Sequence, residues 1–426
     1  MQPLFDGEGS VNDMAARGSR PRSQNYTITF PIPLFSPAPG RLLIPSGLAR
    51  DVRSHAKFEK HLRIIAPGAR RARDVQDAVE VDIKELPGFS FRLLPWSGNP
   101  KTFLAQLLFL RLILASEARD ALVWHTCCST SRWDLTTESY WVGRKHATGL
   151  RVLGLDSDPA AMLEQSGRRD DAAVLRTRYR QWAGDVDLTI MVGQGVFEQY
   201  SAHARKSVLT NAVWLTSDDL ADPAENAAKF ADVAVVRMIL PSRLGAWKGI
   251  DDTIVALRSL AQELPPWRLD IMGDGEDKGR LTDLASSTCE IRFVPPLPYG
   301  AAFFEALRSY HLVIAPTRAQ EETRVVYDAA ASGCVLLHSA TSTLETALAP
   351  LSLRWSFRPG DPQDLARALG EAFAQRSLWA QAARASIEWM RGRTIDEMHA
   401  VRAAALAEAR LGLRSGASTE TGAVQT

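Results

Sequence analysis

The chain has 426 residues and a net charge of +1, because 50 Lys and Arg residues nearly balance 49 Asp and Glu residues. That balance argues against a general nucleic-acid-binding protein. The length suits two α/β domains of ordinary size. The four cysteines show no CxxC or zinc-type spacing, so we expect buried free thiols in a reducing cytosol. They are Cys127, Cys128, Cys289 and Cys334.

The two ends of the chain differ in composition from the rest. Residues 1–24 are rich in Gly, Ser, Asn and Arg and lack a long apolar core, which predicts a disordered arm and no secretory signal. Residues 413–426 are predicted to be a disordered tail on the same grounds. No stretch offers about 20 consecutive apolar residues, so we predict no transmembrane helix.

The first half of the chain alternates apolar runs with helical periodicity. Strands are expected at residues 26–34, 62–66, 121–126, 150–155 and 185–192, with helices at 48–61 and 196–206. Gly40 and Gly47 are the glycines nearest the first strand. His125 ends a buried strand, and the residue types allow either a cleft residue or a core histidine. Asp156 and Asp158 follow another strand; we favour helix capping for Asp158.

Residues 103–115 form an apolar segment with almost no polar face. The segment is too short to span a bilayer, and we expect a core helix. A basic region precedes it, and the two together leave peripheral membrane contact open, although solvated helix faces explain the cations equally well. The basic residues are Arg50, Arg53, Lys57, Lys60, Arg63, Arg70, Arg71 and Arg73.

The second half has a more regular order. Strand-like runs occupy residues 235–240, 267–272, 290–294 and 312–316, and helical segments occupy 251–264, 278–285 and 301–309. This alternation predicts a parallel sheet with helices on both faces. Gly273 and Gly275 follow one strand, but they lack the third glycine of a dinucleotide-binding turn.

One loop in this half carries two cations. Arg243 and Lys248 lie five residues apart between a predicted strand and a predicted helix. A guanidinium fork and an ammonium group at the carboxyl end of a strand can converge on phosphate oxygens. Two solvated surface cations are the alternative.

Three motifs in order carry a resemblance: RLGAWKG, IMGDGEDKGRL and VIAPTRAQEETRVVYDAAASGCVLL. They resemble the nucleotide-sugar-binding half of retaining GT-B glycosyltransferases, specifically the glycosyltransferase group 1 family. The likeness is strong over about residues 235–345, weaker toward 390 and faint before 180. It implies two Rossmann-like α/β domains facing a central cleft. Residues 25–214 would form the acceptor-side domain, 215–392 the nucleotide-sugar domain, and 393–412 a helix that crosses back.

The resemblance also implies roles for the motif residues. Arg243 and Lys248 would bind the donor diphosphate and neutralise charge on the leaving group. A strand-end histidine in the family lines the cleft near the donor sugar, which makes His125 a candidate. The remaining donor-binding positions would approach the nucleoside, the base or the phosphates. The phosphates would be bound by backbone N–H groups at a helix N-terminus. These positions are Gly273, Gly275, Val294, Thr323, Arg324, Val325 and Asp328.

The third motif departs from the family pattern, which has two Glu residues with seven residues between them. Gln320 stands at the first Glu and keeps hydrogen bonding without the charge, while Asp328 stands at the second. Glu321 or Glu322 substitutes if the loop shifts register; a solvated acidic loop is the interpretation we favour. The family works without a metal, so neither a metal site at Asp156–Asp158 nor a cofactor is expected.

By resemblance, the protein would move a sugar, of hexose type, from a UDP-, GDP- or similar nucleotide sugar to an acceptor, with retention of configuration. Glycans, lipid-linked molecules and small molecules are all acceptors of this family, whose members make bacterial polysaccharides. The expected location is cytoplasmic, with peripheral contact at the inner membrane face left open. A degenerate GT-B scaffold and a GT-B sugar-nucleotide epimerase remain as alternatives.

Overall fold

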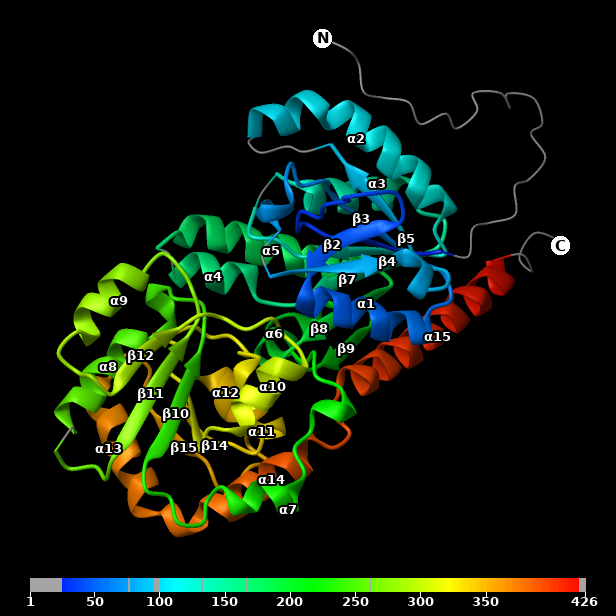
Figure 1. Ribbon diagram of the computed structural model, residues 1–426. Coiled ribbons are helices and arrows are strands. Elements are labelled where there is room, and N and C mark those ends of the chain that lie inside the picture. The colour runs from blue at the N-terminus through cyan, green and yellow to red at the C-terminus, as the bar shows by residue number, and fades with distance from the viewer. Residues whose placement is uncertain are drawn as a thin grey trace.

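The computed structural model describes residues 25–75, 77–95, 100–131, 133–165, 167–260 and 262–420. The predicted arm at residues 1–24 lies outside the described residues, as does the end of the predicted tail at 421–426. The chain forms two α/β domains that lie against each other (Figure 1). The resemblance to a two-domain GT-B fold is confirmed at this level.

The N-terminal domain is built on a seven-stranded parallel sheet in the order β5-β3-β1-β6-β7-β8-β9. Its strands are β1 Tyr26–Thr29, β3 Leu62–Pro67, β5 Ser90–Leu94, β6 Val123–Cys127, β7 Leu150–Leu155, β8 Leu188–Val192 and β9 Ser207–Thr210. A separate antiparallel pair consists of β2 Arg41–Pro45 and β4 Ala78–Asp82. The helices are α1 Ser46–Phe58, α2 Pro100–Asp120, α3 Leu135–His146, α4 Pro159–Gln165, α5 Arg169–Asp185 and α6 Gln194–Tyr200, with short 3-10 turns η1 Ala72–Asp74, η2 Ile83–Glu85 and η3 Ser201–His203.

The C-terminal domain has a six-stranded parallel sheet in the order β12-β11-β10-β13-β14-β15. Its strands are β10 Val236–Pro241, β11 Trp267–Met272, β12 Ile291–Val294, β13 Leu312–Ala315, β14 Val335–Ser339 and β15 Trp355–Phe357. Its helices are α7 Pro223–Ala228, α8 Ile250–Ser259, α9 Lys278–Ala285, α10 Ala301–Arg308, α11 Val325–Ala331, α12 Ser342–Ala347, α13 Pro362–Ala374 and α14 Trp379–Met390, with 3-10 turns η4 Ser217–Asp219, η5 Ala246–Lys248 and η6 Arg376–Leu378. Most strand positions are apolar, although β11 carries Arg268 and Asp270, as expected of a parallel sheet that helices cover on both faces.

The last helix, α15 Ile395–Glu420, returns from the C-terminal domain to the N-terminal domain. The red helix in Figure 1 runs alongside α1. Asp396 accepts a 2.7 Å hydrogen bond from Lys57, and His399 Nε2 lies 3.1 Å from Asp51 Oδ1. The predicted crossover is confirmed, but the helix continues beyond the predicted end at residue 412. The tail predicted from residue 413 therefore starts too early.

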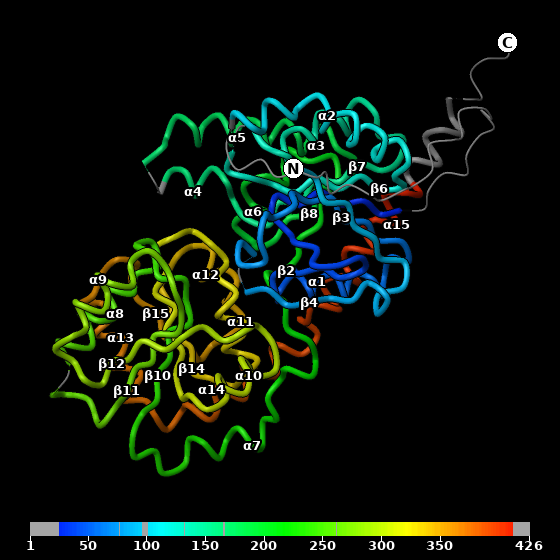
Figure 2. Tube along the Cα trace, turned by 45° about the horizontal axis from the view of Figure 1, so that its top comes forward, coloured from blue at the N-terminus to red at the C-terminus, as the bar shows by residue number. Residues whose placement is uncertain are grey.

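Helix α2 corrects the prediction of a core helix. Its inner face is buried, with Leu114 and Ala118 fully covered. Its outer face is not, because Leu108 is 75% exposed and Leu112 is 64% exposed. Both views show α2 on the side of its domain away from the C-terminal domain (Figures 1 and 2). In the part of the chain that the structure describes, no helix is both long and apolar enough to cross a membrane.

The cysteines follow the expectation in part. All four are free thiols. Cys128 and Cys334 are buried and Cys127 is partly buried, but Cys289 is exposed. Burial, together with the nearby Asp156 carboxylate, raises the pKa of the Cys128 thiol well above its ordinary value. The exposed Cys289 corrects the prediction that all the thiols are buried.

Candidate active site

The C-terminal sheet has a topological switch point between β10 and β13. From β10 the strand order runs outward through β11 to β12, and from β13 it runs the other way through β14 to β15. Loops leaving two such strands diverge and leave a crevice at the carboxyl edge of the sheet, which is where open α/β sheets bind ligands. A hollow occupies this point. It is lined by Leu240, Pro241, Ser242, Lys248, Ile314, Ala315, Pro316, Thr317, Thr323 and Val325.

Lys248 reaches this hollow from the loop after β10. Gly249 follows it with φ at 64°, and a Cβ there would lie 2.1 Å from the carbonyl oxygen of Pro316. Glycine is therefore required by both the left-handed backbone and the close approach of the two loops. The Lys248 ammonium forms an ion pair with Glu321, which also accepts a 3.0 Å hydrogen bond from Thr317 Oγ1. A cation and two hydroxyl-bearing residues, Thr317 and Thr323, thus face one small space.

Arg318, in the loop after β13, contacts both the loop after β10 and the start of α8. Its guanidinium donates to both carboxylate oxygens of Asp252 at 2.6 and 2.9 Å, to Asp251 at 3.0 Å and to the carbonyl of Ala246 at 2.9 Å. The bond to Asp252 is the main cause that raises the Arg318 pKa. Bidentate pairing fixes both distance and orientation, so this contact holds the position of Lys248. Sequence reasoning missed it, although an Asp pair at a helix start opposite an Arg after a strand is the available signal.

Gly273 and Gly275, in the turn after β11, pack against the loop that carries Lys248. A Cβ on Gly273 would lie 1.8 Å from the carbonyl oxygen of Ser242, and one on Gly275 would lie 2.3 Å from that of Leu244. The Leu244 amide also donates to the carbonyl of Asp274 at 3.0 Å. The two glycines therefore let the β11 turn pack against the cationic loop. Val294 ends β12 beside them, and its carbonyl accepts from the Gly273 amide at 3.2 Å.

Arg243 lies on the same loop but points elsewhere in this conformation. It is exposed and does not line the hollow. Among the described residues, no hydrogen bond or ion pair holds its guanidinium. The predicted convergence of Arg243 and Lys248 is therefore not present here, and Lys248 alone of the two lies at the switch point.

The acidic loop differs from its predicted form. Gln320 is exposed, and its side-chain oxygen accepts from Ser342 at 3.0 Å, so it does not reach the hollow. Glu321 takes the place beside Lys248. Glu322 accepts hydrogen bonds from the amides of Gln194 and Ala212, both in the N-terminal domain. The expectation of a solvated acidic loop is wrong, because one carboxylate faces the hollow and the next joins the domains.

Asp328 is closed off from solvent. It is 3% exposed and accepts a 2.6 Å hydrogen bond from the Tyr299 hydroxyl. Burial raises the pKa of Asp328 to about 7. Arg324 is stacked 3.2 Å from the centre of the Trp214 ring, and its burial lowers its pKa. In this conformation Arg324 stacks on Trp214 at the domain junction and Asp328 pairs with Tyr299 inside the C-terminal domain, whereas the prediction placed both at the donor.

Thr323 and Val325 stay at the hollow, but the amides that start α11 are partly used. The Thr323 amide donates to the carbonyl of Glu321, and the Val326 amide donates to that of Thr323. The helix itself is short, Val325–Ala331. The predicted anion site at its N-terminus therefore remains a prediction, with the Thr323 and Val326 amides already hydrogen-bonded in this conformation.

His125 is a core residue, which corrects its assignment to the cleft. It lies in the middle of β6, paired in register with Ile28 and Val152, and is 4% exposed. Its Nδ1 lies 2.7 Å from the Tyr26 hydroxyl, and burial lowers its pKa to about 3. Asp158 caps α4 through the Ala160 amide, as predicted. Asp156 accepts a hydrogen bond from the Cys128 thiol.

The chain has two domains built on parallel sheets, and the carboxyl edges of the two sheets meet at Glu322. Lys248 lies at the switch point of the C-terminal sheet. This arrangement is that of a GT-B protein. Residues 235–375, in the C-terminal domain, match the model of the family named Glycosyl transferases group 1. No curated protein matches the sequence.

Solved structures share the fold over most of the chain. A glycosyltransferase from Rickettsia africae ESF-5 is 14% identical with a TM-score of 0.62, covering 91% of this chain and 98% of its own. Anabaena HepE in complex with UDP and glucose is 14% identical with a TM-score of 0.63, covering 90% and 100%. Sucrose-phosphate synthase from Thermosynechococcus elongatus is 15% identical with a TM-score of 0.65, covering 93% and 100%. At these identities the likeness shows the fold alone.

Proposed function

We propose that the protein transfers a sugar from a UDP-sugar to a glycan, lipid-linked or small-molecule acceptor, with retention of configuration. The observation that carries this proposal is Lys248 at the switch point of a domain that matches the glycosyltransferase family. UDP is the first nucleotide to test, because the HepE structure contains UDP and glucose. Retention follows from the resemblance of the three motifs.

In this proposal Lys248 exchanges one anion for another. Without donor its ammonium is paired with Glu321. An arriving diphosphate would replace that carboxylate and keep the cation neutralised while charge grows on the leaving group. Thr317 and Thr323 supply hydroxyl donors at the same hollow. Arg243, exposed at the rim, is free to fold over the phosphates.

A catalytically inactive scaffold is the second candidate. Asp328 favours it, because its carboxylate is already occupied by Tyr299 and is buried away from any ribose. Gln320 also favours a scaffold, because its side chain lacks the charge of the family Glu and accepts a hydrogen bond from Ser342. A scaffold of this kind would bind a nucleotide without turnover.

The test is thermal stabilisation of the purified protein by UDP, GDP, ADP and TDP. A ligand at about 100 times its dissociation constant adds roughly 2.7 kcal/mol of stability. We expect one nucleotide, UDP first, to stabilise the wild type and to lose this effect in Lys248→Ala. Lys278→Ala, on the exposed side of α9, is the matched control and should respond like the wild type.

Two outcomes separate the candidates. No stabilisation by any nucleotide contradicts the glycosyltransferase proposal. Stabilisation by UDP without release of UDP from any UDP-sugar, across a panel of acceptors, supports the scaffold.

A further inference from the structure

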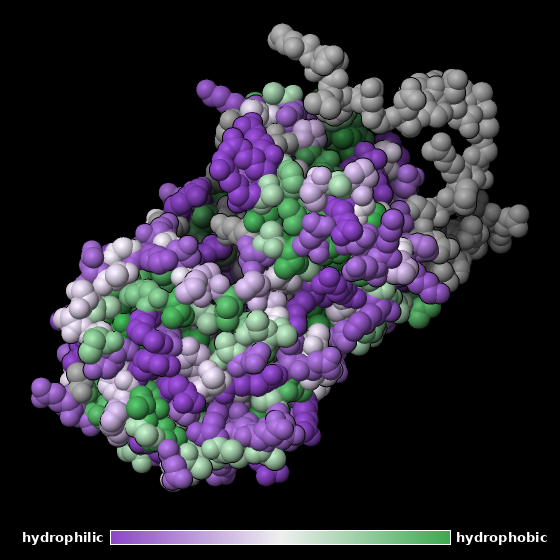
Figure 3. All heavy atoms as spheres, viewed as in Figure 1, coloured by the Kyte–Doolittle hydropathy of each residue, from purple (hydrophilic) through white to green (hydrophobic). Residues whose placement is uncertain are grey.

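The outer face of α2 is an apolar surface with no partner in the described chain. Leu104, Leu108 and Leu112 recur every four residues, so they share one face of the helix. They are 58%, 75% and 64% exposed, and Phe109 beside them is 56% exposed. Figure 3 shows hydrophobic side chains at this end of the N-terminal domain. Single exposed apolar residues are ordinary, but four on one helix face indicate a surface that binds something.

Charge brackets this face. Lys101 and Arg119 are exposed on the same side of α2, before and after the leucines, and the exposed Asp120 ends the helix. Between these two residues, the exposed positions of α2 include no Asp or Glu. An apolar face flanked by cations is the pattern of a helix that lies in a membrane interface.

A cationic loop lies at the start of α2. The Gly68 amide donates to the carbonyl of Leu94 at 2.8 Å, and Pro67 lines one hollow together with Phe103, so the loop after β3 begins near the first turns of α2. This loop carries Arg70, Arg71 and Arg73, all exposed. Within the described residues, no ion pair neutralises these three side chains. The positive charge is therefore available to an anionic surface.

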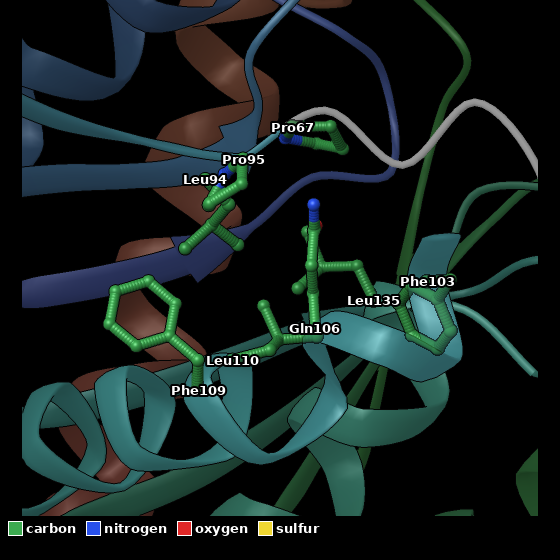
Figure 4. A pocket seen from close by; sticks show the side chains of 8 residues that line it. All are labelled: Pro67, Leu94, Pro95, Phe103, Gln106, Phe109, Leu110 and Leu135. Carbon is green, nitrogen blue, oxygen red and sulfur yellow. The ribbon is translucent and has the colours of Figure 1, made fainter. Parts of the chain in front are cut away.

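The apolar surface also continues inward. A hollow opens between α2 and the carboxyl ends of β3 and β5, and in Figure 4 side chains from α2 face prolines across it. Its lining is Pro67, Leu94, Pro95, Phe103, Gln106, Phe109, Leu110 and Leu135. Phe109 belongs to both the hollow and the exposed face. Trp133, two residues before Leu135, is 70% exposed, and tryptophan favours the boundary between lipid and water.

We propose that the outer face of α2, with the Arg70–Arg73 loop at its start, docks the N-terminal domain on an anionic lipid bilayer. The hollow lies at the same sheet edge as the domain junction. If glycosyl transfer is the function, as proposed above, docking through this face would draw the acceptor from the membrane as an amphiphile. A second copy is the alternative occupant, and the uncompensated Arg70, Arg71 and Arg73 favour an anionic surface over it, because pairing through this face would bring no carboxylates to them.

The experiment is flotation of the full chain with phosphatidylcholine vesicles, with and without phosphatidylglycerol. We expect binding to the anionic vesicles that weakens at high salt. Leu108→Gln/Leu112→Gln keeps good helix formers and removes two apolar contacts, so the partition coefficient should fall at least about tenfold. The matched control is Val255→Gln/Val401→Gln, which changes two exposed apolar residues on α8 and α15.

The proposal is overturned if the wild type does not bind anionic vesicles, or if the α2 double variant binds as well as the wild type. A dimer in sedimentation equilibrium that the α2 variant abolishes, without vesicle binding, would assign the face to a second copy instead. Unchanged thermal unfolding of both double variants confirms that they fold. Nucleotide stabilisation is measured on the same samples, so failure of membrane docking and failure of the nucleotide site give different results.

Discussion

Two carboxylates near the domain junction sit in opposite surroundings. Glu321 is partly exposed and lies beside the Lys248 ammonium. Asp328 is buried, and its main polar contact is the neutral hydroxyl of Tyr299. Burial without a dominant cation favours the protonated acid, which is why the pKa of Asp328 rises while Glu321 serves as a counter-ion.

Asp328 gives the protein a pH dependence. Its pKa is about 7 in the folded chain against an ordinary value of 3.8. Between these values the unfolded chain has lost a proton that the folded chain keeps, so the free energy of unfolding falls as pH rises. The loss is at most about 1.4 kcal/mol per pH unit. Asp328→Asn should remove it, as urea unfolding at pH 5 and pH 7 would measure. Equal pH slopes for both proteins would contradict this.

Glu321 should weaken nucleotide binding by competing for Lys248. Glu321→Gln removes the competing charge, so UDP affinity should rise about two- to fivefold, the range expected for a partly exposed ion pair. Isothermal titration calorimetry measures this, with Gln320→Ala as the neighbouring control, since Gln320 bonds only Ser342 in the described structure. An affinity for UDP that does not rise in Glu321→Gln would contradict this, and weaker binding in Gln320→Ala would give Gln320 the donor contact that the sequence predicted.

At the residue scale, sequence patterns could place Lys248 because a loop between a strand and a helix has few geometries. They could not place Glu321, because a shift of one residue in an irregular loop leaves no periodic trace. They also could not predict that Tyr299 would cover Asp328. That contact depends on a loop folding across from β12, which local sequence does not encode.

Among the elements, the predicted bounds agree best with the structure where strands are buried on both faces. β11 and α9 have the predicted bounds, Trp267–Met272 and Lys278–Ala285. Apolar runs with Gly and Pro at their ends mark such strands clearly. The β2–β4 pair was missed, because its strands are short and half-exposed. The outer face of α2 was assigned to the core, because hydrophobicity alone does not distinguish burial in protein from contact with lipid.

The turn after β11 yields a prediction about loop support. Gly273→Ala would place a Cβ 1.8 Å from the Ser242 carbonyl, so the cationic loop must move. We expect a loss of about 1–3 kcal/mol in the free energy of unfolding and weaker UDP binding. Gly279→Ala, on α9, has nothing within 4 Å of the new Cβ and should gain up to about 1 kcal/mol. Urea unfolding compares them. Equal stability of both variants would mean the turn does not support the loop.

On the scale of the whole molecule, several polar contacts join the two domains. Arg50 of α1 pairs with Asp219, and the Tyr299 amide donates to Ser46 at 3.1 Å. Glu322, in the loop after β13, accepts from the amides of Gln194 at the start of α6 and of Ala212 after β9. Polar interfaces of this kind allow domains to move. Because Asp328 is 3% exposed, nucleotide access to its carboxylate requires the surrounding contacts to open.

Glu322 is the residue whose loss should open the protein. Glu322→Ala removes the acceptor of the Gln194 and Ala212 amides and of the Tyr327 hydroxyl. We expect a larger radius of gyration by small-angle X-ray scattering and a loss of about 1–3 kcal/mol in stability. Glu198→Ala is the control, because Glu198 is exposed on α6 and accepts a 3.0 Å hydrogen bond only within that helix, from the side chain of Gln194; both quantities should stay unchanged. If opening admits nucleotide, UDP should restore the compact form. An unchanged radius in Glu322→Ala would show that the other junction contacts suffice to hold the domains closed.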